Sequence, residues 1–412
     1  MAIILIWIVS LGSLLLMLAR PRGIAESVWI CGGAILLVAT RLLPARAALG
    51  AIGEGTDVYL FLAGMMLLAE LAREEGVFDW VADIAVRHAK RSAGRLFLWV
   101  YVAGIAVTAL LSNDATAVVL TPAVLAAVRR SKVEPRPHLL ACAMIANAAS
   151  FLLPISNPAN LVVFRSHLPA LGEWLRMFLL PSLASIAVTF VCLRILLRRG
   201  LAGVAAEEER PRELGTGGWM ALAGIALAGV VLLICSGLGL ELGLPTCAAG
   251  LLTMGFVATR DRQAPKTAMR QVSWSVLPLV AGLFVLVEAL NRAGLLEATK
   301  ASLHWLARAP DGLGKFAGGF GIALISNGMN NLPAGLAAGA ALREIAHRGV
   351  LAHAVLLGVD VGPNLSVTGS LATILWLIAL RREGAEITAR EFLKVGLIAM
   401  PAALALALLA LR

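Results

Sequence analysis

Long apolar runs alternate with short polar segments along most of the chain. An α-helix needs about 20 apolar residues to cross the hydrocarbon core of a bilayer, and most of the runs approach or reach that length. The pattern predicts an all-α polytopic membrane protein. The run at 58–71 is short, but it continues to residue 75 if Glu70 and Arg73 are accommodated. The apolar runs are 2–19, 27–43, 58–71, 177–197, 219–235, 244–258, 274–290 and 392–411.

Two segments, 77–92 and 295–309, have a different pattern. Apolar and charged residues are mixed in them at helical spacing, which is typical of an amphipathic helix that lies along the membrane interface. The stretch 200–216 is polar and contains glycine and proline. It predicts a cytoplasmic linker between two halves of the chain, 1–199 and 217–412.

Composition and charge agree with a membrane protein. The 412 residues are 59% hydrophobic and 15% charged, with a mean hydropathy of +0.87, whereas a soluble domain carries roughly 25% charged residues. The net charge of +10 is spread over short loops between the apolar runs, which is the positive-inside pattern and argues against a nucleic-acid partner. The five cysteines show no paired spacing, so neither a disulfide framework nor a zinc site is expected.

The charge bias also predicts a topology. It favours about ten transmembrane helices with both termini outside the cytoplasm, provided that 96–128 and 313–342 each enter and leave the membrane on the same side. These two segments are therefore predicted to be re-entrant hairpins.

Matching residues occur in the same order in the two halves, which predicts an internal repeat. The separation is 218 residues for the first three pairs, 214 for the next two and 213 for the last. The charge bias puts the ends of the two hairpins on opposite sides, so the repeats are expected to be inverted, as in many secondary transporters. The pairs are Gly64 and Gly282, Glu70 and Glu288, Gly76 and Gly294, Ser112 and Ser326, Asn113 and Asn327, and Asn147 and Asp360.

Four polar clusters interrupt the apolar pattern, two at the hairpin tips and two inside broken helices at about 138–166 and 351–380. Proline and glycine open the helices there, and opened backbone at membrane depth is tolerated only inside protein or beside a wet cavity. The clusters predict a binding site for a small polar solute or ion, although any single residue could instead join helices by hydrogen bonds. The candidate substrate-binding residues are Ser112, Asn113, Thr116, Ser156, Asn157, Asn160, Asn327, Asn330, Asn331, Asn364, Thr368 and Ser370.

Four carboxylates lie within apolar segments, where ionisable groups are costly and mark functional sites by default. Asp114 and Asp360 belong to the polar clusters and are candidates for proton or cation coupling. Glu70 and Glu288 occupy matching positions in the two halves and are further candidates for proton coupling. Each could instead have a structural role by pairing with an arginine one turn away.

Four pieces of the sequence, SNDATAVVLTP, ISNPANLVV, ISNGMNNLPAGL and GVDVGPNLSVTGSLATILWL, resemble signatures of the bacterial arsenical pump membrane protein family. These are arsenite/antimonite efflux permeases of the ion transporter superfamily. The resemblance implies export of arsenite and antimonite across the bacterial inner membrane in exchange for protons. It also implies a scaffold domain, a transport domain with two hairpins, and an elevator-like movement. Some family members use a soluble arsenical ATPase subunit, so that subunit and a second copy of the chain are candidate partners. No cofactor is implied.

The residue types in the clusters suit such a substrate. Arsenite at neutral pH is a small uncharged trihydroxide, and Asn, Ser and Thr side chains supply the donors and acceptors that it needs. The clusters contain no Lys or Arg, which a dicarboxylate would require. Cys142 could contact a thiophilic solute, although a packing role is the simpler interpretation.

Other functions fit the sequence less well. A sodium/proton antiporter or a small-anion transporter of the same superfamily is the alternative. A channel is disfavoured because no span has a continuous polar face. An enzyme is disfavoured because the chain has neither a phosphate-binding loop motif nor an evident nucleophile–base arrangement.

Overall fold

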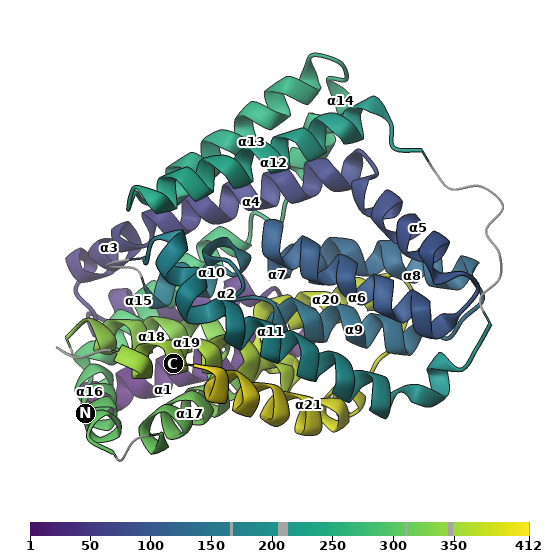
Figure 1. The fold of residues 1–412 in the computed structure, drawn as a ribbon. Helices are drawn as coiled ribbons and strands as arrows, with labels where there is room; N and C mark the ends of the chain where they lie inside the picture. The colour runs from purple at the N-terminus through teal and green to yellow at the C-terminus, as the bar shows by residue number, and fades with distance from the viewer. Residues whose placement is uncertain (165–167, 205–212, 310–311, 345–348, 412) are drawn as a thin grey trace.

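The chain folds into a bundle of helices, and the all-helical membrane architecture predicted from the sequence is confirmed (Figure 1). The computed structural model describes residues 1–164, 168–204, 213–309, 312–344 and 349–411. Within them the regular structure is helical apart from one antiparallel bridge, between Ser92 and Val204. Part of the predicted linker, 205–212, and the end of the first broken helix, 165–166, lie outside the described residues.

The helices of the second half follow those of the first in the same order and at nearly constant spacing. Both ends of α5 lie 218 residues before the corresponding ends of α16. The first series is α1 (Ala2–Ala19), α2 (Glu26–Ala39), α3 (Ala45–Glu54), α4 (Thr56–Glu74), α5 (Val77–Ala89), α6 (Ala93–Leu110), α7 (Asn113–Ala115), α8 (Thr121–Arg130), α9 (Pro135–Ala148), α10 (Pro158–Val163) and α11 (Leu171–Leu196). The second series is α12 (Thr216–Gly237), α13 (Gly243–Ala258), α14 (Gln263–Gln271), α15 (Val276–Arg292), α16 (Leu295–Ala307), α17 (Leu313–Met329), α18 (Asn331–Arg343), α19 (Gly349–Val361), α20 (Leu371–Arg382) and α21 (Ala389–Ala410).

Corresponding helices pack across the two halves. The helix α4 packs along α13, and its counterpart α15 packs along α2. Each crossing has a glycine: a Cβ on Gly64 would collide with the backbone of Thr246, and one on Gly282 would press on Ile30 and the backbone of Cys31. Small residues allow helices to approach this closely, so the repeated glycines fix where the two halves interlock.

A second pair of matching glycines begins the two amphipathic helices. Gly76 precedes α5 with a φ of 75°, and Gly294 precedes α16 with a φ of 101°. Glycine adopts these left-handed conformations without the steric cost that a Cβ carries. The predicted helices over 77–92 and 295–309 are thus present, and each starts at a sharp change of direction that its glycine permits.

Fewer spans than predicted meet a length-and-composition criterion. Six helical segments of the described chain are long and apolar enough to cross a membrane, and a pair bent by 48°, α3 with α4, makes a seventh. The predicted number was about ten. The difference arises because α2 and α13 have only 14 and 16 residues, and because the two broken helices are each divided by non-helical backbone. The six segments are α1, α6, α11, α12, Gln263–Arg292 and α21.

Candidate functional site

Two interrupted helices provide the centre of the candidate site. In the first, α9 is separated from α10 by a loop that includes a 3₁₀ turn at Pro154–Ser156, and in the second, α19 is separated from α20 by 3₁₀ turns at Gly362–Asn364 and Val367–Gly369. The second segments begin in the same way. The side chain of Asn157 accepts a hydrogen bond from Ala159 N at the start of α10, and that of Ser370 accepts one from Ala372 N at the start of α20. Both side chains are N-caps, and each marks the point where the non-helical stretch ends and the second helical segment begins.

The two interrupted helices are joined by buried polar contacts. Asn157 donates from Nδ2 to Asp360 Oδ1 at 2.6 Å. Asn147 donates from Nδ2 to Asn364 Oδ1 at 3.1 Å and to Thr373 Oγ1 at 3.3 Å. Side chains of both helices are inaccessible to solvent here, with Asp360 0% exposed. We call these five residues the central network.

The tip of the second hairpin, α17 and α18, is bound to the break of the second interrupted helix. Asn327 donates from Nδ2 to the Gly362 carbonyl at 2.8 Å and accepts from Ser366 Oγ at 2.6 Å. The hydroxyl of Thr368 donates to the Asn327 carbonyl at 3.0 Å, and Asn330 Nδ2 donates to the Thr368 carbonyl at 3.3 Å. Three of the predicted residues, Asn327, Asn330 and Thr368, therefore join these two clusters.

The turn of this hairpin lies at Asn330, which has a φ of 78° and a ψ of 151°. Residues with a Cβ rarely occupy this region, and doing so costs about 1–3 kcal/mol. Asn330 also caps α18 through Leu332 N, as Ser112 caps α7 through Ala115 N. The pairing of Ser112 with Ser326 is therefore wrong by four residues.

The first hairpin, α6 with α7 and α8, has its own contacts. Thr116 begins a π-helical turn, Thr116–Leu120, and shares a hydrogen bond of 2.8 Å with Thr108. Asn113 is 2% exposed, and its Oδ1 accepts from the adjacent Asp114 N. The tip of this first hairpin is joined to the loop between α9 and α10, because Ser156 Oγ donates a hydrogen bond to the Ala109 carbonyl. No hydrogen bond between described residues joins the two hairpin tips directly.

Three further predicted residues have clear environments. Asn160 Nδ2 donates to the carbonyls of Ser150 at 2.9 Å and Pro154 at 3.2 Å, so it closes the first break. Asn331 is buried at the start of α18. Cys142 is buried in α9 and packs within the apolar core. The central network also contains Asn147 and Thr373, which were not among the candidate substrate-binding residues. The matching of Asn147 with Asp360 was the signal that could have included the first of them.

Several buried polar atoms of this region lack a hydrogen-bond partner among the described residues. Nearly all buried polar groups in proteins are paired, so such atoms supply donors and acceptors for a small polar solute or an ion. They are Asp360 Oδ2, Asn147 Oδ1, Asn160 Oδ1 and Ser326 Oγ. The hydrogen bonds of the central network involve no Lys or Arg. No group of three or more His, Cys, Asp or Glu in the described chain is placed to hold a metal ion.

The two glutamates at matching positions form ion pairs. Glu70 Oε2 lies 2.6 Å from Arg73 Nε, and Glu288 Oε1 lies 2.6 Å from Arg292 Nε. Glu70 also lines a small cavity of about 50 Å³, together with Ser112 and Asp114 of the first hairpin. The ion pairs favour the structural alternative for these glutamates, while the cavity places Glu70 close to Asp114.

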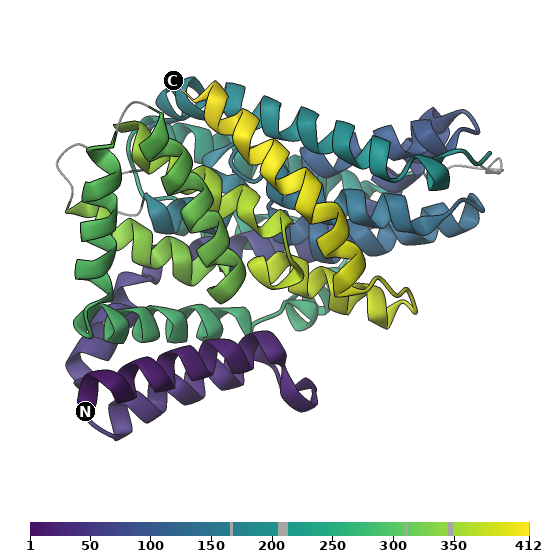
Figure 2. The same ribbon diagram turned by 90° about the horizontal axis from the view of Figure 1, so that it is seen from below.

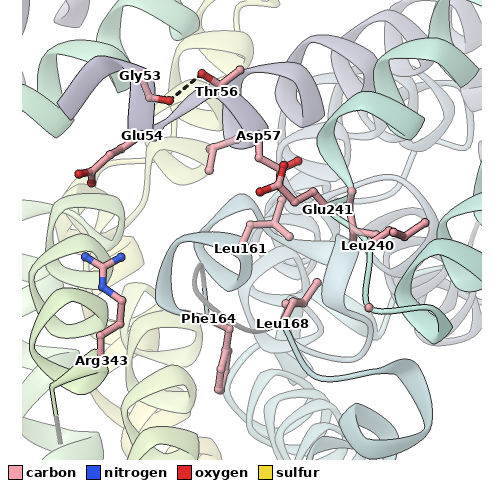
Figure 3. Close-up of a pocket in the computed structure, with 13 residues that line it drawn as sticks. Gly53, Glu54, Thr56, Asp57, Leu161, Phe164, Leu168, Leu240, Glu241 and Arg343 are labelled. Atoms are coloured by element: carbon pink, nitrogen blue, oxygen red, sulfur yellow. Dashed lines mark hydrogen bonds between the residues drawn. The ribbon is translucent and has the colours of Figure 1, made fainter. Parts of the chain in front are cut away.

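A second cavity, of about 750 Å³, lies at the opposite end of α4 (Figure 3). It is bounded by the α3–α4 junction, the turn between α12 and α13, and the end of α10, where Leu161 and Phe164 line it. Its charged residues are Glu54, Asp57, Glu241 and Arg343. The side chain of Asp57 accepts from Gly243 N at 2.6 Å, which ties the α12–α13 turn to α4. The face of α4 thus borders a large cavity at one end and a much smaller one at the other.

Comparisons with known proteins agree with this architecture. The arsenical pump membrane proteins of Yersinia enterocolitica and of Escherichia coli K12 are 29% and 27% identical, covering 81% and 94% of this chain and 81% and 93% of their own lengths. The Alcanivorax borkumensis YdaH transporter has a similar fold, with a TM-score of 0.59, 16% identity, and coverage of 93% of this chain and 96% of the transporter. The predicted resemblance to arsenical pump membrane proteins is confirmed. A family model described as "Citrate transporter" matches residues 3–359, and the chain therefore belongs to this family of membrane transporters, CitMHS.

Proposed function

We propose that this protein is a secondary transporter that exports arsenite and antimonite from the cytoplasm in exchange for protons. The observation that carries the proposal is the central network, where amide and hydroxyl side chains and one buried carboxylate join the two interrupted helices without Lys or Arg. An uncharged trihydroxide can exchange hydrogen bonds with such groups and requires no fixed charge. The names of the related arsenical pump membrane proteins support the same substrate.

Solute binding is assigned to the two interrupted helices and the second hairpin. Asn147, Asn160 and Ser326 each offer a buried polar atom without a partner among the described residues, and Asn327 and Asn330 hold the hairpin tip over the second break. A solute bound there would replace some of these contacts. Binding would then be linked to the position of the hairpin.

Proton coupling is assigned to Asp360 and Asp114. An ionised Asp360 accepts the hydrogen bond of Asn157 at 2.6 Å, but a protonated carboxyl group becomes a donor on one oxygen. Protonation would therefore rearrange the same network that binds the solute. A neutral solute gains nothing from the membrane potential, so its accumulation needs an ion whose binding favours one conformation over the other.

Alternating access is proposed to occur by movement of the hairpins and interrupted helices against a scaffold of α1–α5 and α12–α16, which correspond in the two inverted repeats. The two cavities along α4 support this interpretation. The interface of α4 with α10 has a cavity of about 750 Å³ near Asp57 and one of about 50 Å³ near Glu70. With the orientation favoured by the charge bias, this is an outward-facing state.

Citrate is the main competing substrate, because the family description names it. A polyanion is usually held by Arg or Lys, and the central network contains neither. A sodium/proton antiporter is the other competitor, since a buried carboxylate with amide oxygens can also bind a small cation.

Transport into inverted membrane vesicles distinguishes these substrates. Uptake of arsenite, antimonite and citrate is measured in vesicles whose interior is more acidic than the medium, in vesicles without a pH gradient, and in the presence of sodium. The proposal predicts gradient-dependent arsenite and antimonite uptake and no citrate uptake. Citrate uptake without metalloid uptake, or sodium-driven proton movement alone, would replace it.

A further inference from the structure

A cleft of about 320 Å³ lies at the opposite end of α9 from Asn147 of the central network, where three helices reach one face of the molecule. The helix α9 begins there at Pro135, α11 ends at Leu196 and α21 begins at Ala389. Both α11 and α21 are long and apolar enough to span a membrane, and they pack side by side (Figure 2). The cleft therefore lies where two spans end, at the level of lipid headgroups.

Three cations from three different elements line this cleft. Arg136 comes from α9, Arg199 from the 3₁₀ turn Arg198–Leu201 after α11, and Lys394 from the first turns of α21. Arg136 has a side-chain exposure of 61%. Neither Arg199 nor Lys394 forms an ion pair with a residue in the part of the chain that the structure describes.

Two carboxylates also line the cleft but do not cancel the positive charge. Glu391 accepts from Thr388 N at 2.8 Å and from Thr388 Oγ1 at 2.9 Å. Both contacts engage Oε2 of Glu391, which in this way caps the start of α21. Arg136 Nη1 lies 3.6 Å from Glu391, a loose contact that leaves most guanidinium donors available. With Glu134 as the second acid, the lining retains an excess of one positive charge.

The remaining wall is apolar and continues toward the lipid-facing side. Leu140 and Val395 are buried at its base. Leu196 lines the cleft and is exposed, and Ile195 and Val191 continue the exposed apolar surface along α11. A ligand in this cleft would meet cations at one end and a hydrocarbon-compatible surface at the other.

We propose that the cleft binds the headgroup of an anionic phospholipid. Its phosphate lies beside Arg136, Arg199 and Lys394, and its acyl chains lie along the outer surface of α11. Basic pockets between the ends of spans are suited to phosphate headgroups, and the apolar wall favours a diacyl lipid over free phosphate. The proposal concerns a lipid and is independent of the transported solute.

Native mass spectrometry of the full-length protein in detergent tests this site. The probe lipids are phosphatidylglycerol and zwitterionic phosphatidylethanolamine. Each surface cation contributes about a fivefold factor to binding an anionic membrane component, so R136Q/R199Q/K394Q should lower phosphatidylglycerol affinity by about a hundredfold. The matched control, R260Q/R262Q/K266Q, removes two arginines and one lysine that are also exposed but lie outside the cleft. The control variant should bind phosphatidylglycerol with an affinity within about threefold of the wild type.

Two further measurements separate a lipid site from a loss of fold and from a site for free phosphate. The charge-conserving variant R136K/R199K/K394R should bind phosphatidylglycerol nearly as well as the wild type, which separates loss of charge from loss of fold. Inorganic phosphate should not displace the lipid. Equal losses in the cleft and control variants would overturn the proposal, as would unchanged affinity in the cleft variant or displacement by phosphate alone.

Discussion

Replacement of Asp360 by asparagine separates the proposed coupling role of this residue from its contribution to folding. The side chains have nearly the same shape, and an asparagine oxygen can still accept the hydrogen bond from Asn157 Nδ2 that is 2.6 Å long in the wild type. The substitution therefore keeps the contact between the two interrupted helices. It removes the carboxylate that could carry a proton.

The expected effect on stability can be worked out from this contact. A hydrogen bond to a charged group contributes about 1.5–3 kcal/mol, and a neutral one about 1 kcal/mol. The loss of about 1 kcal/mol is offset because burial of a charge carries a penalty of several kcal/mol. Asp360→Asn should thus unfold at the same temperature as the wild type or higher. Asn157→Ala removes the hydrogen-bond donor of the Asp360 carboxylate, which is 0% exposed. This variant should lose about 1.5–3 kcal/mol of unfolding free energy.

The assay is antimonite uptake into inverted vesicles with and without a pH gradient, at matched amounts of folded protein. Uptake by Asp360→Asn should fall to the level of wild-type vesicles without a gradient, and adding the gradient should have no effect. Asp261→Asn is the control, because Asp261 is an exposed carboxylate whose side chain caps Gln263 N. This variant should transport like the wild type.

Two results would refute the reasoning. Gradient-driven uptake by Asp360→Asn at the wild-type rate would show that Asp360 does not carry the coupling proton. A fall in thermal stability equal to that of Asn157→Ala would show instead that the charge itself is needed for folding, and loss of transport could then not be assigned to coupling.

Three further changes test the packing, the hairpin turn and a cap. Gly64→Leu should prevent α4 from packing on α13 and abolish folded protein by size-exclusion chromatography, whereas Gly50→Leu, with no atoms near its Cβ position, should fold normally. Asn330→Gly should be about 1–2 kcal/mol more stable to thermal unfolding than Asn330→Ala, because only glycine relaxes the backbone at a φ of 78°. Glu391→Gln should lower the thermal midpoint, because the hydrogen bonds from Thr388 N and Thr388 Oγ1 to a charged oxygen, 2.8 and 2.9 Å long, would become weaker bonds to a neutral amide oxygen.

Much of the local structure follows from patterns within single segments. The amphipathic spacing at 77–92 and 295–309 predicted α5 and α16, and in the structure each begins directly after one of the matching glycines, Gly76 and Gly294. The ion pairs of Glu70 with Arg73 and of Glu288 with Arg292 were an alternative that spacing on one helix face suggested. Such features depend on neighbours within one or two turns, which the sequence displays directly.

Contacts between distant segments were harder to predict from the sequence. The hydrogen bond between Asn157 and Asp360 joins residues 203 positions apart, and no local pattern determines which amide meets the carboxylate. The match of Ser112 with Ser326 also did not show where the second hairpin turns within its polar cluster. The turn forms at Asn330, where a side chain can cap the following helix and hold the next segment.

The two contacts between the interrupted helices correspond in position but differ in charge. Asp360 and Asn147 are equivalent by spacing, and each meets a polar residue of the opposite interrupted helix. An amide cannot gain or lose a proton in the relevant range, whereas a carboxyl group can. The asymmetry confines any protonation in this network to the contact between Asp360 and Asn157, while the contact of Asn147 with Asn364 keeps its donor and acceptor in both states. The contact of Asp360 with Asn157 can then respond to protons, while the contact of Asn147 with Asn364 holds the two interrupted helices together.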